Sequence, residues 1–163
     1  MKATLILLSR LTTALQSHCQ NDVSKNGITV SWKYKNERIH FEMAAPTKGW
    51  VSIGFNTTQT MTGAYLIMGR VRNQKAEVVE RYTISSGNYK SITKLGGTAE
   101  VEDLTGSETD EQTTLQFSMP NTAKSKYARN LAKGTEYIMT LAFSRDDDFQ
   151  HHSMMRTSIN VKL

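Results

Sequence analysis

The sequence has 163 residues, of which 38% are hydrophobic and 8% aromatic, with two prolines and ten glycines. This length allows one core of ordinary size, and this composition excludes a disordered or collagen-like chain. The formal charge is +5, but Lys and Arg are scattered among Asp and Glu without a basic stripe, so nucleic-acid binding is not expected.

Residues 1–17 have the features of an export signal. Lys2 supplies positive charge, residues 3–8 are mostly apolar, and Leu15-Gln16-Ser17 offers a small-residue cleavage site. A membrane span needs about 20 apolar residues, and no such run exists in the sequence. We therefore expect a secreted or periplasmic protein with residues 18–163 as its one mature domain, without a transmembrane segment and with a mildly cationic surface.

Cys19 is the only cysteine. A single cysteine excludes an internal disulfide, a CxxCH site for covalent haem and a cysteine-based iron–sulfur or zinc cluster. Cys19 lies where a bacterial lipoprotein carries its acylated cysteine, but no small residue directly precedes it, so a lipid anchor is only weakly indicated. Any metal must be held chiefly by His, Met or carboxylates.

From Ile28 onward, short segments with period two predict β-strands. Residues 28–34 and 39–43 form a predicted hairpin. Further strands are predicted at 50–55, 64–71, 76–84, 99–104, 113–119, 136–144 and 157–163, with a solvated acidic loop at 105–112 and one short helix over Ser125–Lys133, ended by Gly134. The pattern indicates an all-β fold, an antiparallel immunoglobulin-like β-sandwich of about ten strands.

Met61 lies in a threonine-rich loop, at a position where the pattern predicts exposure. A thioether there can bind haem iron or copper, or it can fill a gap in the core.

A second group of possible ligands, Asp146 to Met155, includes His151 and His152. Adjacent residues of an extended chain point to opposite faces, so one imidazole can bind a metal while the other meets solvent. If this loop meets Met61, sulfur and imidazole could approach an iron from opposite sides, and such closed ligation favours electron transfer.

Two motifs carry a resemblance to a known family. Gly49-Trp50-Val51-Ser52-Ile53-Gly54-Phe55-Asn56, followed by Met61-Thr62-Gly63-Ala64, resembles the Gly-Trp-x-x-x-Gly-Phe strand and Met-x-Gly-Ala of DOMON domains. His152-Ser153-Met154-Met155-Arg156-Thr157 is similar to the His-x-x-x-Arg stretch before the family's final strand. The resemblance covers about residues 26 to 163, although Tyr65 stands where the family often has Asp.

The resemblance implies a non-covalent haem b with Met61 and His152 as its axial ligands, since His152 has the family's spacing to Arg156. His151 is the alternative ligand. Trp50 and Tyr65 are expected beside the cofactor, and Arg156 is expected to pair with a haem propionate or to form a salt bridge at the surface.

The leading hypothesis is a secreted b-type cytochrome that passes single electrons to a redox partner protein. This partner can be a soluble or a membrane-associated protein. No nucleophile, base and acid occur at a defensible spacing, so the domain is not expected to be an enzyme. One alternative is a haem-free module that presents Trp50 and Tyr65 to a sugar or another small ligand. Another is a copper site built from His151, His152 and nearby methionines.

Overall fold

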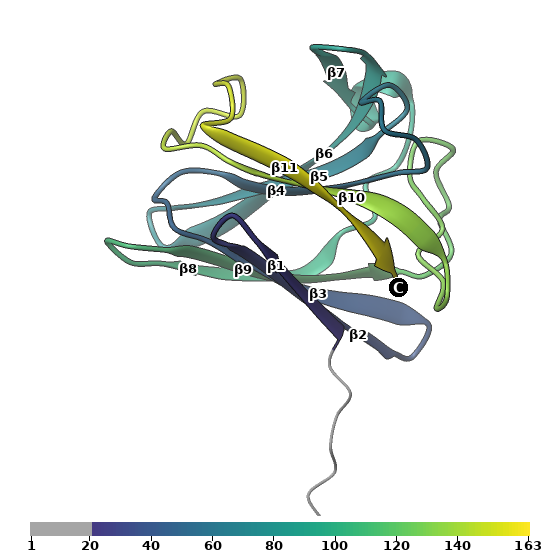
Figure 1. The fold of residues 1–163 in the computed structure, drawn as a ribbon, viewed down its shortest axis with the longest axis horizontal. Coiled ribbons are helices and arrows are strands. Elements are labelled where there is room, and N and C mark those ends of the chain that lie inside the picture. The colour runs from purple at the N-terminus through teal and green to yellow at the C-terminus, as the bar shows by residue number, and fades with distance from the viewer. Residues whose placement is uncertain (1–20) are drawn as a thin grey trace, which may run out of the picture.

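The computed structural model describes residues 21–163, so the expected export signal and Cys19 lie outside the described residues (Figure 1). The described part is built from strands and one short 3-10 helix, η1 (Thr93–Leu95). The strands are β1 (Asn21–Lys25), β2 (Ile28–Lys35), β3 (Arg38–Ala45), β4 (Val51–Asn56), β5 (Tyr65–Arg72), β6 (Lys75–Ser85), β7 (Asn88–Ser91), β8 (Glu102–Glu108), β9 (Thr113–Pro120), β10 (Glu136–Phe143) and β11 (Met155–Lys162).

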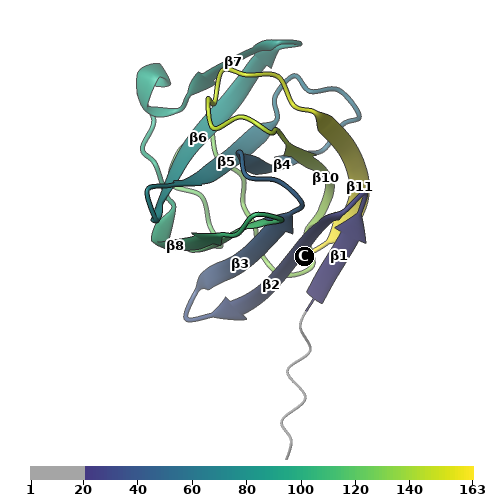
Figure 2. The ribbon, with the colours of Figure 1, turned by 90° about the vertical axis from the view of Figure 1, so that its left-hand side faces the viewer.

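These strands form two antiparallel sheets that pack face to face (Figures 1 and 2). The five-stranded sheet has the order β1-β2-β3-β9-β8, and the six-stranded sheet has the order β11-β10-β4-β5-β6-β7. The predicted sandwich is confirmed. It has eleven strands within residues 21–163, because β1 and β7 add an edge strand to each sheet.

The hairpin of β2 and β3 shows how the sequence sets the register. Asn36 and Glu37 both have positive φ, at 49° and 60°, as a tight two-residue hairpin turn requires. Trp32 then pairs with Phe41, and their side chains face the interior with the other apolar residues of the hairpin. The Phe41 and Phe55 ring centroids are 5.8 Å apart, which joins the two sheets through the core.

Strand β4 is buried along its whole length, on both of its faces. Val51, Ile53 and Phe55 belong to the core between the sheets. Ser52 and Asn56 alternate with them and must therefore point to the outer side of the six-stranded sheet, yet they are buried as well. Loops therefore cover this outer face, and in Figure 1 the segment between β10 and β11 and the β6–β7 hairpin both rise above it.

The helix predicted over Ser125–Lys133 is wrong, because this segment consists of turns and coil. One local turn bond occurs, from Ala128 N to Ser125 O at 3.1 Å, but other backbone groups of the segment bond to residues outside it. Leu131 N donates to Asn121 O at 2.8 Å, and the Tyr34 hydroxyl donates to Leu131 O at 2.9 Å. Buried Ala128 and Leu131 thus anchor a loop on the core.

The acidic loop is shorter than predicted. Strand β8 begins at Glu102 and continues to Glu108, so the turn comprises only residues 109–112. A bulge between Glu102 and Thr105, where Asp103 has a φ of 52°, shifts the register of the strand. Within residues 21–163, no helix has the length and apolar character to cross a bilayer.

Candidate functional site

A cavity of about 310 Å³ lies on the outer face of the six-stranded sheet, within the usual size range of ligand and cofactor sites. Side chains of β4, β5 and β10, with Trp50 directly before β4, form its floor. Loop residues form its walls together with residues of β6, β7 and β11. The floor residues are Trp50, Ser52, Leu66, Met68, Thr140 and Ala142, and the walls are Met61, Thr83, Gly87, Asn88, Tyr89, Gln150, His151, His152, Ser153 and Arg156.

Met61 and the two histidines line this one cavity although they are far apart in the sequence. The topology explains how they meet. Strands β4 and β10 pair antiparallel, with Asn56 opposite Ile138 and Val51 opposite Phe143. The Met61 loop follows the end of β4 and the histidine loop follows the end of β10. The two loops therefore start from opposite ends of this pair and face each other across the sheet.

The hydrogen bond that the sulfur of Met61 accepts is weak. Met61 is partly buried, and the Thr140 hydroxyl lies 4.0 Å from its Sδ atom. Ala64 N donates to Met61 O at 3.0 Å, so the backbone around this residue forms a turn. A side chain held in this way leaves its soft sulfur lone pairs available to a ligand in the cavity.

The imidazoles of His151 and His152 are both exposed at the opposite wall. His151 Nδ1 lies 3.8 Å from Asp146 Oδ2, which is too long for a hydrogen bond. The acidic side chains of the loop serve its own backbone, because Asp146 Oδ1 accepts from Asp148 N at 2.7 Å and Asp148 Oδ1 accepts from Gln150 N at 2.9 Å. These carboxylates shape the loop that presents the histidines.

An apolar cluster at the base of the histidine loop forms part of the cavity floor. It consists of Trp50, Met68 and Ala142, with Val79 and Phe149 packed against it. Arg70 covers Phe149, with its guanidinium carbon 4.5 Å from the ring centroid. The guanidinium carbon of Arg81 lies 6.0 Å from the centroid of the same ring, and desolvation by burial lowers the pKa of Arg81.

Two buried polar atoms in the cavity residues have no partner. They are the indole nitrogen Nε1 of Trp50 and the hydroxyl of Thr83. A buried polar group without a hydrogen bond typically costs about 1–3 kcal/mol, so such atoms are uncommon in native proteins. With the mostly apolar floor and the Met61 sulfur and histidine imidazoles at the walls, these atoms suit a large, mostly apolar molecule that carries some polar groups.

Of the other residues expected at the site, Trp50 and Arg156 line the cavity but Tyr65 does not. Strand alternation is the reason, since Leu66 and Met68 occupy the cavity side of β5 and Tyr65 points between the sheets. Its hydroxyl donates to Glu80 Oε2 at 2.5 Å. Burial and the neighbouring Glu80 raise the pKa of Tyr65 well above its usual value.

Sequence reasoning missed the floor residues Leu66, Met68, Thr140 and Ala142 and the wall residues Thr83 and Tyr89. One signal could have found part of this set. Residues 64–68 are apolar at every position, which is unusual for a strand with one solvated face. Such a run indicates that both faces are covered, here by the core and by the cavity.

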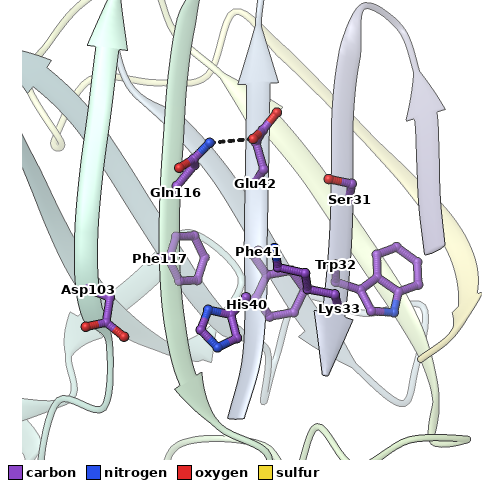
Figure 3. Close-up of a pocket in the computed structure, with 9 residues that line it drawn as sticks. All are labelled: Ser31, Trp32, Lys33, His40, Phe41, Glu42, Asp103, Gln116 and Phe117. Atoms are coloured by element: carbon purple, nitrogen blue, oxygen red, sulfur yellow. Dashed lines mark hydrogen bonds between the residues drawn. The ribbon is translucent and has the colours of Figure 1, made fainter. Parts of the chain in front are cut away.

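A second, smaller cavity of about 230 Å³ lies on the outer face of the five-stranded sheet (Figure 3). Its outward side chains are polar, and Gln116 Nε2 donates to Glu42 Oε2 at 2.6 Å. His40 lies on this outer face, and desolvation with nearby Lys33 lowers its pKa. None of the predicted ligands borders this cavity.

The comparisons agree with this fold. A DOMON domain family model matches residues 24–144. The cytochrome b domain of pyranose dehydrogenase from Coprinopsis cinerea is similar, with a TM-score of 0.63 and 9% identity, over 83% of this chain and 76% of that chain. The cytochrome domain of Myriococcum thermophilum cellobiose dehydrogenase gives a TM-score of 0.61 and 12% identity, over 88% of this chain and 81% of that one. The family match covers most of the sandwich, so the chain belongs to the DOMON domain family.

Proposed function

We propose that this DOMON domain binds haem b non-covalently in the cavity of the six-stranded sheet and carries one electron at a time. Met61 and His152 would be the two axial ligands. The observation that carries the proposal is that Met61 and the tandem histidines, from separate loops, line opposite walls of one cavity.

The donor set and the cavity lining both favour haem. A thioether with an imidazole is a known axial pair for haem iron in electron-transfer proteins, and a methionine ligand raises the reduction potential. When bound, haem supplies a one-electron couple between its ferric and ferrous states. The protein would bind the macrocycle on Leu66, Met68 and Ala142 and would exclude water through the cluster around Trp50.

His152 is proposed over His151 because its spacing to Arg156 follows the family pattern, and Arg156 lines the same cavity. A guanidinium at the cavity wall suits a haem propionate, since arginine binds carboxylates through two parallel hydrogen bonds. His151 would then remain at the surface, beside Asp146.

The proposed cellular role is that of a secreted or periplasmic electron carrier that serves a redox partner protein and has no catalytic set of its own. The two similar structures are cytochrome domains of cellobiose and pyranose dehydrogenases, which supports electron transfer. The sugar-binding alternative has less support, because Trp50 is 3% exposed and Tyr65 is fully buried, so neither ring offers a platform to a sugar.

Absorption spectra of the haem-reconstituted domain test the proposal. We expect low-spin spectra in both oxidation states, and we expect Met61→Ala and His152→Ala each to abolish the six-coordinate form. Met154→Ala and His151→Ala are matched controls, since Met154 is exposed on the same loop and should not alter the spectrum. A domain that takes up no haem but binds copper would contradict the proposal. A low-spin spectrum that is lost in His151→Ala but kept in His152→Ala would contradict the choice of His152 as the ligand.

A further inference from the structure

Asn56, the last residue of β4, holds the loop that carries Met61. Its side chain is buried, and it donates from Nδ2 to Thr60 O at 2.6 Å and to Thr62 O at 3.0 Å. These two carbonyls belong to the residues directly before and after Met61. The Asn56 Oδ1 atom accepts from Thr57 N at 2.9 Å, so both ends of the amide are in use.

Arg129 holds the same loop from a different part of the chain. Its guanidinium donates to Gly63 O, and it lies 5.8 Å from the centre of the Tyr82 ring. On the sheet side, Gly63 N donates to Thr83 O at 2.8 Å. Gly63 has a φ of 81°, a conformation that favours glycine, and this allows the chain to turn back into β5.

We propose that Asn56 and Arg129 are positioning residues that fix the direction of the Met61 side chain before any cofactor enters. This inference rests on the proposed function, in which Met61 is an axial ligand. Thr60 O belongs to the peptide group before Met61, and Met61 O, which accepts from Ala64 N at 3.0 Å, belongs to the peptide group after it. Together with the bond to Thr62 O, these contacts fix the backbone on both sides of Met61 and hence the direction of its Cα–Cβ bond. A ligand that is already oriented loses less conformational freedom on binding, which strengthens its bond to the metal.

The proposal depends on the amide group and not merely on a polar side chain. A carboxylate of the same shape can still accept from Thr57 N, but it has no proton to donate to Thr60 O and Thr62 O. Asn56→Asp therefore removes the two bonds around Met61, places negative charge beside two carbonyl oxygens and keeps the volume. Asn130→Asp is a matched control, because Asn130 is exposed and its side chain only accepts a hydrogen bond, from Ala123 N.

The first measurement uses the haem-free domain, so that it does not depend on the cofactor. We expect amide hydrogen exchange of residues 57–63 to speed up by about tenfold or more in Asn56→Asp, since about 1.4 kcal/mol of lost local stability corresponds to a factor of ten. Arg129→Gln should also speed up the exchange of these amides, and it replaces Asn56→Asp in the test if Asn56→Asp does not fold. Unchanged exchange in both variants would overturn the inference.

The second measurement uses the haem-loaded domain. We expect Asn56→Asp to increase the high-spin fraction and to lower the reduction potential in the direction of Met61→Ala, because methionine ligation raises the potential. Faster exchange with an unchanged spectrum and potential, while Met61→Ala alters both, would overturn the positioning role alone. A Met61→Ala variant with the wild-type spectrum would overturn the proposed ligand, and this inference with it.

Discussion

The backbone of Gly49 lies against that of Asp146 with no room for a side chain between them. A Cβ atom at Gly49 would come within 2.6 Å of both the amide nitrogen and the carbonyl oxygen of Asp146. Trp50 N also donates to Asp146 O at 3.2 Å. The glycine of the Gly-Trp motif thus permits the close approach of the segment that leads to His151 and His152.

Gly49→Ala should therefore destabilise the domain and displace the histidine loop. Overpacking at a close contact typically costs about 1–3 kcal/mol. Denaturant unfolding of the haem-free protein measures this cost, and a haem titration should show weaker binding. Gly106→Ala is the control, because its Cβ would contact Leu115 and Val71, away from the cavity. Equal losses of haem affinity in the two variants would contradict this role of Gly49.

Arg70 holds the histidine loop by two contacts and is itself anchored to Glu77 of β6. It donates to Asp147 O at 2.5 Å and to Glu77 Oε2 at 2.8 Å, and it stacks on Phe149. A lysine keeps the charge but lacks the planar fork that makes these contacts together. We expect Arg70→Lys to lower stability by about 1 kcal/mol and to speed haem release several-fold, whereas Arg72→Lys, at the exposed end of the same strand, should do neither. Stopped-flow transfer of haem to an acceptor protein measures the release rate.

Tyr65 makes the free energy of unfolding of the domain depend on pH in the alkaline range. Burial and Glu80 raise its pKa well above the usual 10.0, so the folded state resists its ionisation. A group whose pKa is higher in the folded state stabilises the protein fully below its unfolded pKa, and this contribution is lost as pH rises towards the folded pKa. Above pH about 10, stability should fall by about 1.4 kcal/mol per pH unit through this residue.

Tyr65→Phe should remove that part of the slope. It should also cost about 1–3 kcal/mol at neutral pH, because Glu80 Oε2 loses a buried partner. Urea unfolding at pH 7, 10 and 11 gives both quantities. The pKa of Tyr34 is also raised, to about 12, and adds a further fall in stability with rising pH that the wild-type domain and Tyr65→Phe share. Parallel stability curves for the two proteins above pH 10 would contradict the prediction.

Local signals predicted much of the fold. The β2–β3 hairpin follows from strict alternation and from a turn that begins with Asn36, a residue type that tolerates positive φ. The helix predicted over 125–133 does not form, because tyrosine hydroxyls and distant backbone groups make the hydrogen bonds to the backbone of this segment. Helix propensity is a weak preference that such tertiary contacts override.

The candidate site was predictable only in part. The motifs pointed to Met61 and His152, but only the antiparallel pairing of β4 and β10 explains why their loops face each other. Tyr65 was expected at the site because it follows the Met-x-Gly-Ala motif, and its register in β5 turns it into the core instead. Register depends on long-range pairing, which a single sequence does not reveal.

The unpaired hydroxyl of Thr83 allows a direct test of the cavity's polar character. Thr83→Val keeps the shape and removes a buried group that has no partner, so the haem-free domain should keep its stability or gain up to about 1 kcal/mol. If the cavity ligand bonds to this hydroxyl, haem affinity should fall about fivefold, as expected for one hydrogen bond of about 1 kcal/mol.

Thr113→Val is the matched control, because the buried Thr113 hydroxyl donates to Thr47 O at 2.8 Å. The same swap there leaves a carbonyl without its donor and should cost about 1–3 kcal/mol. Unfolding curves of the two haem-free variants make the comparison. Equal destabilisation would mean that Thr83 already has a partner in the protein, and its hydroxyl would then not be available to a cofactor.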